Sequence, residues 1–390
     1  MNFNVYIPTR VLFGAGRLND LHTQSMPGKK AMIVISNGKS TRANGALTRT
    51  EEQLRLAGVE TALFDKVGAN PLKCVVEEGA AFARSNECDF VVALGGGSVM
   101  DAAKVMAMYA PQPGELWDYV GGATGKNKPL VREPLPVVAI TTTAGTGSEV
   151  DQWGVVTNPE TNEKIGCGGM DSLFPVLAVV DAELMTTVPP KFTAYQGFDT
   201  LFHAVEGYIS AAANPMSDMV QAASITRVGK YLARAVKNGA DMEARENMAF
   251  ANTLSGWSMV TGSCTSEHSM EHAMSAYHPD LPHGAGLIMI SKAYFTHFIN
   301  KHACDERFVE MAQMLGMADA AAPMDFITAL EKLQKDCGVD DLKMSDYGII
   351  IDECMTLAKN ARATMGGLFA CDRIPLTDEE CAAIYEKSYR

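Results

Sequence analysis

The sequence predicts two domains of different class, an N-terminal α/β domain built on a doubly wound parallel sheet and an all-α C-terminal domain. Up to residue 188, short apolar segments rich in β-branched residues alternate with segments of helical periodicity, a pattern typical of parallel strands joined by helical crossovers. From Lys191 onward, strand-like alternation is nearly absent, and helical patterns are separated by Gly, Pro and Asp. A chain of 390 residues also exceeds the roughly 250–300 residues at which a single core stops growing. We therefore place the domains at residues 1–188 and 189–390.

The strands expected in the first domain are short, apolar segments separated by helical ones. They are AMIVIS (31–36), ETALFD (60–65), DFVVALGGG (89–97), PVVAITT (136–142) and VLAVVD (176–181). Helical patterns between them cover residues 45–57, 74–86 and 98–110. Small or polar residues follow the carboxyl end of each strand, where open α/β sheets bind their ligands.

The amino-acid composition and net charge argue against nucleic acids and membranes as binding partners. The chain is 47% hydrophobic and 20% charged, which is sufficient for a large buried core. A net charge of −13 without a basic block argues against binding to nucleic acid or to anionic membranes. No apolar run approaches the roughly 18–20 residues that a membrane span needs. The expected partner is therefore a small molecule.

Cysteine usage and the N-terminal residues both favour a cytoplasmic location. The nine cysteines are scattered and form no CxxC pair, so neither a zinc ribbon nor a thioredoxin-type redox motif is indicated. The first residues, MNFNVYIPTRVLFGAG, lack the basic region and apolar core of a signal peptide. We expect a protein of a reducing compartment.

A glycine-rich segment, GGGSVMDAAK at 95–104, directly follows a predicted buried strand and opens a helix. Glycines allow a backbone to approach an anion closely, and a helix N-terminus offers unpaired N–H groups and a positive dipole. Ser98 is placed to cap that helix. A plain strand-to-helix turn explains a bare GGG equally well. Neither a GxGxxG fingerprint nor a Walker A loop is present.

Two further polar loops follow predicted strands. TTTAGTGSEV at 141–150 supplies hydroxyl groups and two glycines, and two such loops together favour a phosphate-bearing ligand. SNGKSTRANG at 36–45 stands where an adenosine ribose would be recognised, and it contains no Asp or Glu. A carboxylate there would favour NAD, so Lys39, Ser40 and Arg42 leave NADP open, although they could equally form a solvated turn.

One apolar helical segment, GFDTLFHAVEGYIS at 197–210, carries a carboxylate and an imidazole on one face. Asp199 and His203 are four residues apart, so their side chains are neighbours on the helix. An ordinary salt bridge and half of a metal site are both consistent with this spacing.

The segment SEHSMEHAMSAYHPDLPHGAG at 266–286 contains four of the eight histidines, and it makes the metal site the better interpretation. They are His268, His272, His278 and His283. Four imidazoles within 16 positions, with Asp199 and His203 in the same domain, favour a divalent metal over a structural cluster. An oxygen ligand with imidazoles suits Fe²⁺ or Zn²⁺, which would polarise a carbonyl or lower the pKa of an alcohol.

In their order along the chain, GGGSVMDAAK, TTTAGTGSEV, GFDTLFHAVEGYIS and HSMEHAMSAYHPDLPHG resemble the motifs of the iron-containing (group III) alcohol dehydrogenase family. The resemblance implies a Rossmann-like dinucleotide-binding domain followed by a helical, metal-binding catalytic domain, an architecture shared with dehydroquinate synthase. It implies that Asp199, His203, His268 and His283 hold the metal, with Fe²⁺ in the first place and Zn²⁺ as the alternative. His272 would lie beside the substrate without binding the metal and could relay a proton.

The same resemblance implies the residues that bind the nicotinamide cofactor. They are Asn37, Gly38, Lys39 and Ser40 in the ribose loop, Gly96, Gly97 and Ser98 at the pyrophosphate with Asp101 on the following helix, Thr141, Thr142, Gly145 and Ser148 on the phosphate and nicotinamide side, and Lys164 near the cofactor. Lys104 follows on the same helix as Asp101. NAD-type members carry an Asp in the ribose loop that this chain lacks, so the choice between NAD and NADP stays open. His278 could also compete with His283 as the fourth ligand.

Three functions are compared. The first is reversible hydride transfer between nicotinamide C4 and a small primary alcohol or aldehyde of butanol, lactaldehyde or sulfoacetaldehyde type, with the metal holding the oxygen. The second is a dehydroquinate synthase-like lyase, which would need several Arg or Lys around the metal, whereas residues 190–290 have few near the ligand motifs. The third is a non-catalytic helical oligomer or nucleotide sensor. The first is favoured, as a homodimer or larger homo-oligomer.

Overall fold

The computed structural model describes residues 3–390 and divides them into two compact units. The first is an α/β unit, Tyr6–Thr187, and the second is a helical unit, Val188–Arg390, together with the start of the chain. Each is described by itself below.

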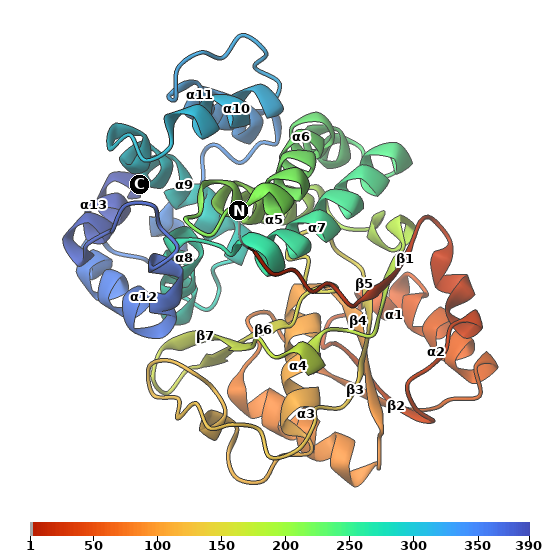
Figure 1. The fold of residues 1–390 in the computed structure, drawn as a ribbon. Helices are drawn as coiled ribbons and strands as arrows, with labels where there is room; N and C mark the ends of the chain where they lie inside the picture. Colours follow the sequence, from red (N-terminus) through yellow and green to blue (C-terminus); the bar gives the residue numbers. More distant parts are fainter. Residues whose placement is uncertain (1–2) are drawn as a thin grey trace. The chain divides into compact units, whose positions relative to one another are not determined.

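The α/β unit is built on a six-stranded sheet with the strand order β1-β8-β5-β4-β2-β3, in which every neighbouring pair is parallel (Figure 1). Its strands are β1 (Arg10–Phe13), β2 (Lys30–Ser36), β3 (Glu60–Val67), β4 (Phe90–Gly95), β5 (Val137–Thr141) and β8 (Leu177–Val180). A separate antiparallel hairpin is formed by β6 (Trp153–Asn158) and β7 (Glu163–Gly168). The helices are α1 (Ser40–Ala43), α2 (Ala46–Leu56), α3 (Lys73–Ser85) and α4 (Gly97–Tyr109).

Both faces of this sheet are covered, which explains why its central strands are apolar at consecutive positions. Alternate residues of β2 point to opposite faces: Met32 and Val34 join a core with α3 and α4, whereas Ala31 and Ile33 join a core with α2. Figure 1 shows α1 and α2 on one side of the sheet and α3 and α4 on the other.

The strand order reverses between β2 and β4. The chain passes from β2 to the edge strand β3, crosses back to β4 and then continues through β5 and β8 in the opposite direction. In doubly wound sheets a ligand binds at such a switch point, outside the carboxyl ends of the two strands. The glycine-rich segment follows β4 and the loop at residues 36–45 follows β2, so both lie at this point.

The helical unit contains nine α-helices and no strand within Val188–Arg390. They are α5 (Pro190–Ile209), α6 (Pro215–Lys237), α7 (Met242–Gly262), α8 (Ser266–Tyr277), α9 (His283–Asn300), α10 (Asp305–Met314), α11 (Asp325–Asp336), α12 (Cys354–Phe369) and α13 (Asp378–Ser388). Helix α5 packs against α6, α7 and α9, and α8 packs against α9 and α12. Because α5 is surrounded, nearly all its residues from Tyr195 onward are buried.

The expected fold class is confirmed, and the five expected strands are present with small differences at their ends. The sequence analysis did not identify β1 or the β6–β7 hairpin, because these strands are short and two of them are interrupted by glycine. Helix α5 also begins at Pro190, seven residues before the segment first recognised, since proline is well suited to a first helical turn. Within residues 3–390, no helix combines the length and apolar character needed to cross a bilayer.

The close packing of α9 on α5 depends on Gly284. A Cβ atom at this position would lie 2.2 Å from the carbonyl oxygen of Tyr195 in α5. We therefore expect Gly284→Ala to push the helices apart and to lower the free energy of unfolding by about 1–3 kcal/mol. Urea denaturation measures the change. Gly366→Ala in α12 is the control, because no neighbouring heavy atom lies within 4 Å of the added Cβ; equal losses in the two variants would contradict the prediction.

Candidate functional site

Helix α5 presents three ionisable side chains on one buried face. Asp199, His203 and Glu206 are four and three residues apart, a spacing that aligns them along the helix, and none is more than 5% exposed. Burial of an ionisable group is unfavourable unless the group is paired or hydrogen-bonded. Neighbouring side chains or a bound ligand must therefore provide partners for these three groups.

Three imidazoles converge on one carboxylate oxygen, Asp199 Oδ1. It lies 3.2 Å from Nδ1 of His203, 3.4 Å from Nε2 of His268 and 3.5 Å from Nε2 of His283. These histidines lie on α5, α8 and α9, so the site exists only where the three helices meet. The ligand atoms of Asp199, His268 and His283 all lie within 4.8 Å of one another.

Two buried glutamates determine which imidazole nitrogens face this centre. Nδ1 of His268 is hydrogen-bonded to Glu206 Oε1, and Nδ1 of His283 is hydrogen-bonded to Glu271 Oε2. With Nδ1 donating to a carboxylate, each ring presents the lone pair of Nε2 toward Asp199. This carboxylate–histidine arrangement is the usual support of metal-binding histidines.

The donor set fits a divalent cation. Among residues 3–390, neither Asp199 Oδ1 nor His268 Nε2 has a hydrogen-bonding partner, although both are buried. A buried, unsatisfied polar atom costs about 1–3 kcal/mol and more when it is charged, and a bound cation would satisfy both atoms together.

The electrostatics of the site also favour a cation. Burial by itself raises the pKa of Asp199, but the charges of His203 and His283 outweigh burial and hold that pKa well below its usual range. Burial lowers the pKa of His268, but the Glu206 carboxylate raises that pKa well above the value of a free imidazole, so a cation would bind Nε2 by displacing the proton that the metal-free site holds there. Ionised carboxylates thus dominate the site and attract positive charge.

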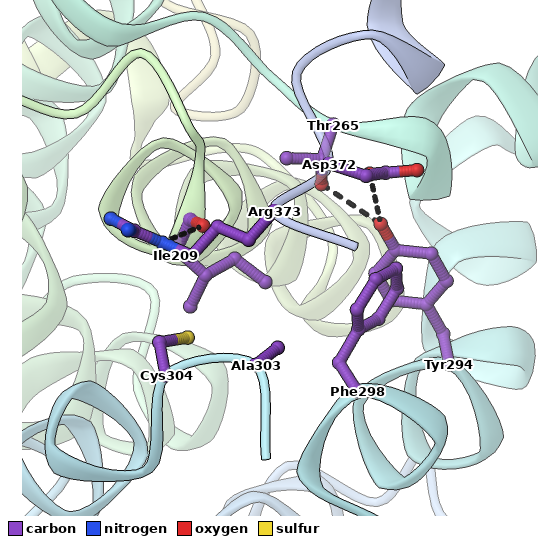
Figure 2. Close-up of a pocket in the computed structure, with 8 residues that line it drawn as sticks. All are labelled: Ile209, Thr265, Tyr294, Phe298, Ala303, Cys304, Asp372 and Arg373. Carbon is purple, nitrogen blue, oxygen red and sulfur yellow. Dashed lines mark hydrogen bonds between the residues drawn. The ribbon is translucent and has the colours of Figure 1, made fainter. Parts of the chain in front are cut away.

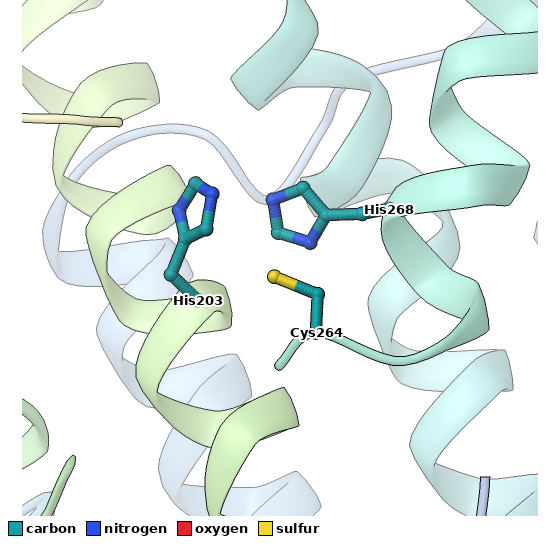
Figure 3. Close-up of side chains that lie close together, drawn as sticks. All are labelled: His203, Cys264 and His268. Carbon is teal, nitrogen blue, oxygen red and sulfur yellow. The ribbon is translucent and has the colours of Figure 1, made fainter. Parts of the chain in front are cut away.

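His203 occupies a distinct place in the cluster. Its Nδ1 donates to the backbone carbonyl of Asp199 at 2.8 Å, which leaves Nε2 as the nitrogen with a lone pair. Its ring centroid lies 4.2 Å from that of His268, and the two rings form a second buried cluster with Cys264 (Figure 3).

His272 and His278 lie outside the group around Asp199. Nδ1 of His272 lies 2.7 Å from the sulfur of Met365, and its ring centroid is 5.2 Å from that of His283. His278 at the end of α8 is paired with Glu353, with 2.8 Å between Nε2 and Oε2, and it belongs to none of the ligand clusters found among residues 3–390.

Sequence reasoning missed three groups of this site: Glu206, Glu271 and Cys264. The spacing contained a signal for the two glutamates, because Glu206 is seven residues after Asp199 and Glu271 is three residues after His268, each on the same helical face. No such periodicity marks Cys264, which lies in the connection between α7 and α8.

A small cavity is lined by residues that include Thr265, Tyr294 and Asp372 (Figure 2), and Thr265 connects it to Glu206. Glu206 Oε2 accepts hydrogen bonds from the backbone N–H and the hydroxyl of Thr265 at 2.8 and 2.9 Å. The Tyr294 hydroxyl lies 2.9 Å from Thr265 Oγ1 and 3.2 Å from Asp372 Oδ1, and both residues line the cavity. Burial raises the pKa of Asp372 to about 7, consistent with a neutral carboxyl whose Oδ2 has no partner among the described residues.

In the α/β unit, the two glycine-containing loops lie against each other. A Cβ atom at Gly96 would approach the side chain of Thr143 to 2.8 Å, and one at Gly97 would approach that of Thr146 to 2.3 Å. Both glycines are partly exposed at the N-terminus of α4. The N-cap is Gly96 without a side-chain cap, so the expectation that Ser98 caps this helix is wrong. The partly exposed first turn of α4 offers its N–H groups at the switch point.

The polar side chains behind these loops bind mainly to one another. Ser148 Oγ donates to Asp101 Oδ1 at 2.7 Å, and the backbone N–H of Val155 donates to Asp101 Oδ2 at 3.1 Å. Lys104 is 1% exposed, and its ammonium group lies 2.8 Å from both Asp151 Oδ1 and the carbonyl oxygen of Ser148. In this arrangement Asp101, Lys104 and Ser148 hold the loop in place.

The other predicted cofactor residues lie at the end of β5, in the loop that follows it and on β7. Thr141 ends β5 and Thr142 follows it; both are buried, and the backbone N–H of Thr142 donates to the carbonyl of Gly95 at 2.9 Å. Gly145 lies between the two threonines that contact the glycine loop. Lys164 is buried on β7 opposite Thr157.

The loop after β2 is exposed. Residues 37–40, which comprise Asn37, Gly38, Lys39 and Ser40, connect β2 to α1 on the protein surface. The backbone N–H of Asn37 donates to the carbonyl of Val67 at 2.9 Å, which fixes the start of the loop. Arg42 is paired with Asp65 at 2.5 Å.

A doubly wound sheet with a glycine-rich loop at its switch point, together with a helical unit that contains a buried Asp–His cluster, is typical of the class of metal-dependent, dinucleotide-using enzymes. Comparison with known proteins specifies the family. Residues 8–182 match the iron-containing alcohol dehydrogenase family, and residues 193–389 match the C-terminal part of the Fe-containing alcohol dehydrogenase family.

Individual relatives agree with this match. A 1,3-propanediol dehydrogenase of Klebsiella pneumoniae is 33% identical over 99% of both chains. An NAD-dependent methanol dehydrogenase of Bacillus methanolicus is 33% identical over 92% of this chain and 93% of its own. The structure of an archaeal halo-thermophilic alcohol dehydrogenase from a Red Sea brine pool, 33% identical, superimposes with a TM-score of 0.94 over 100% of this chain and 99% of that one.

The chain belongs to the iron-containing alcohol dehydrogenase family. It is therefore an oxidoreductase that acts on the CH–OH group of alcohols or on the corresponding aldehydes. This membership replaces the lyase and the non-catalytic alternatives considered from sequence.

Replacing Glu206 by Gln should weaken metal binding about 10–100-fold, the usual effect of removing a partner of a metal-binding histidine. Glu206 accepts hydrogen bonds at both oxygens, and an amide nitrogen cannot accept, so either His268 or Thr265 loses its partner. Competition with a chromogenic chelator measures the dissociation constant. Glu310→Gln, which alters a carboxylate bonded to Tyr208 elsewhere in the unit, is the control; an unchanged constant in Glu206→Gln would refute the prediction.

Asp372 should make the unfolding free energy depend on pH. Because burial raises its pKa from 3.8 to about 7, the folded protein binds this proton more tightly than the unfolded chain does. The stability from this proton is fully present below pH 4 and is lost as the pH rises to about 7, a total of at most about 4 kcal/mol. Asp372→Asn mimics the neutral carboxyl and should remove that decrease, as measured by urea denaturation with a chelator present.

Asp325→Asn provides a control of opposite sign for this experiment. The backbone N–H groups of Ala322 and Ala321 lower the pKa of Asp325, so its contribution to stability is lost as the pH falls. A profile for Asp372→Asn parallel to that of the unmodified protein would show that Asp372 is not the titrating group.

Proposed function

We propose that the protein interconverts small primary alcohols and aldehydes by an NAD(P)-dependent, metal-dependent reaction. The single observation that supports this most strongly is the convergence of three imidazoles on the buried carboxylate of Asp199, with Nδ1 of His268 and of His283 already bound by glutamates. We assign the metal ligands as Asp199, His203, His268 and His283, and Fe²⁺ as the ion, with Zn²⁺ as the alternative.

A divalent ion in this position supplies a Lewis acid that polarises the substrate oxygen. The task of the chain is to hold the four ligands in place and to limit the access of water. Asp199, His203 and His268 are each at most 5% exposed, whereas the side chain of His283 is 21% exposed and marks the more open side of the cluster. We infer that the substrate approaches from the side of His283.

His272 is assigned as the residue that transfers a proton. Its ring lies next to that of His283, on the more exposed side of the cluster, without being part of the group around Asp199. Nδ1 is directed at the sulfur of Met365, a weak acceptor, so Nε2 carries the lone pair that can take a proton from an alcohol or return it to an aldehyde oxygen.

We assign cofactor binding to the loops at the switch point of the sheet. Gly96, Gly97 and Ser98 at the N-terminus of α4 would bind the pyrophosphate through backbone N–H groups. Thr141, Thr142, Gly145 and Lys164 are assigned to the nicotinamide side, and Asp101 and Ser148 shape that loop through their mutual hydrogen bond. A nicotinamide cofactor supplies or accepts the hydride.

The segment proposed to bind the adenosine ribose determines whether the protein can use NADP as well as NAD. The exposed segment Asn37–Ser40 contains no carboxylate, which would permit the 2′-phosphate of NADP. The relative from Bacillus methanolicus is named as NAD-dependent. We therefore propose that the site can bind either NAD or NADP.

Substrate class, assembly and location complete the proposal. The relatives are named for propanediol and methanol, which supports a short alcohol or aldehyde of butanol, lactaldehyde or sulfoacetaldehyde type. We propose a homodimer or larger homo-oligomer. All nine cysteines are unpaired, which supports a reducing, cytoplasmic environment.

The function is tested by an anaerobic panel of short aldehydes with NADH and with NADPH, after loading with Fe²⁺ or Zn²⁺. Turnover of at least one aldehyde is expected. Asp199→Ala should lose both metal and turnover, because a central ligand is removed. His272→Ala should retain the metal but lower kcat by about 10²–10⁴-fold, as is typical for loss of a general acid–base group. Full turnover by metal-free Asp199→Ala, or loss of metal from His272→Ala, would contradict the assigned roles.

A further inference from the structure

Cys264 introduces a thiol directly beside the proposed metal ligands. It lies four residues before His268, in the connection between α7 and α8, and is 6% exposed. Its sulfur and the ligand atoms of His203 and His268 all lie within 4.8 Å of one another. Figure 3 shows the two rings opposite each other, with the Cys264 sulfur directed toward them from one side. Among residues 3–390, no other cysteine belongs to such a cluster.

The nitrogens of this cluster have the lone pairs that a metal needs. Nδ1 of His203 donates to a backbone carbonyl and Nδ1 of His268 is bonded to Glu206, so both rings have Nε2 available as a donor. Nε2 of His268 is buried and has no hydrogen-bonding partner among the described residues. The same nitrogen lies 3.4 Å from Asp199 Oδ1, and His268 belongs both to the group around Asp199 and to the cluster with Cys264.

Two imidazoles and a thiol are a donor set typical of Zn²⁺ and softer ions, whereas Asp199 with imidazoles suits Fe²⁺. Donor atoms on one tetrahedral Zn²⁺ lie about 3.3–3.6 Å apart, because Zn–N and Zn–S bonds are about 2.0 and 2.3 Å long. Since the three atoms already lie within 4.8 Å, closing them onto one ion requires movements of at most about 1.5 Å. Such movements are within reach of side-chain torsions.

We propose that His203, Cys264 and His268 form a second metal position, which overlaps the first and takes soft divalent ions such as Zn²⁺ and Cd²⁺ in preference to Fe²⁺. The thiol loses its proton to solvent as sulfur binds the ion. His268 is common to both positions, and its Nε2 has one lone pair, so the two cannot be occupied together. A soft ion held by Cys264 therefore excludes Fe²⁺ from the position around Asp199.

This inference rests on the proposed metal centre, and its test separates the two. The full-length protein, stripped of metal by a chelator, receives one equivalent of Cd²⁺ or Co²⁺, and thiolate-to-metal charge-transfer absorption is recorded. The unmodified protein should show this absorption and Cys264→Ser should not. Cd²⁺ affinity should fall about 10-fold or more in Cys264→Ser, while Fe²⁺ affinity stays nearly unchanged.

Cys337→Ser is the matched control, because Cys337 is also 6% exposed and lies in the same unit, at the end of α11. It should keep the absorption. Circular dichroism and the melting temperature of the metal-free variants show whether each one folds. His283→Ala should also keep the absorption, because His283 does not belong to the cluster of His203, Cys264 and His268.

Each alternative outcome is informative. Stoichiometric Cd²⁺ binding with the same spectrum in Cys264→Ser would overturn the sulfur-containing position and leave the metal centre intact. Loss of the absorption in His283→Ala would show that sulfur belongs to a single shared position rather than a second one, which also overturns the proposal. Failure of the unmodified protein to bind Fe²⁺, Co²⁺ or Cd²⁺ would overturn the metal centre itself.

Discussion

The convergence of three imidazoles on the buried oxygen of Asp199 is the constraint on which the helical unit depends. It requires α5, α8 and α9 to meet within a few ångströms, since the residues involved lie on all three helices. Small residues in the first turn of α9 permit this approach. A Cβ atom at Gly284 would collide with the backbone of α5, and one at Gly286 would lie 2.7 Å from the side chain of Glu271. Because Gly286 has no side chain, the Glu271 carboxylate fits beside α9 and can hydrogen-bond to Nδ1 of His283.

The electrostatic cost of this arrangement explains the polar network around it. Asp199, Glu206 and Glu271 are buried together, and such a group of carboxylates is tolerated only when each is paired or hydrogen-bonded. Glu206 binds His268 on one side and Thr265 on the other, and Thr265 continues through Tyr294 to Asp372. Asp372 is the last group in this series of hydrogen bonds. Burial raises its pKa to about 7, so below that pH its carboxyl group is mainly neutral and adds no further negative charge. The cation that the cluster is suited to bind would neutralise the remainder.

In the α/β unit, the main constraint is the close packing of the glycine loop after β4 against the loop after β5. The reversal of strand order between β2 and β4 leaves an open edge at the carboxyl ends of the strands, and α4 begins there without a side-chain cap. Gly96 and Gly97 lie so close to Thr143 and Thr146 that a side chain at either glycine would collide. Paired charges behind the loop, with Lys104 bound to Asp151, fix its shape. The polar side chains of this region therefore bind mainly to one another, and the backbone of the glycine loop is left partly exposed.

Much of the fold, and the types of side chain that form the Asp–His cluster, could be predicted from the sequence by itself. Helical and strand periodicities are local properties, so the order of elements, the position of the glycine loop after β4, and the placement of Asp199 and His203 on one helical face were predictable. The tertiary structure decided which distant groups meet. The spacing places Glu206 and Glu271 on the same helical faces as Asp199 and His268. It does not show that these glutamates bind Nδ1 of His268 and His283, that His278 is instead paired with Glu353, or that Cys264 lies beside His203. These contacts depend on how α5, α8, α9 and α12 pack, and helix packing is set by the shape of whole surfaces rather than by local spacing along the chain.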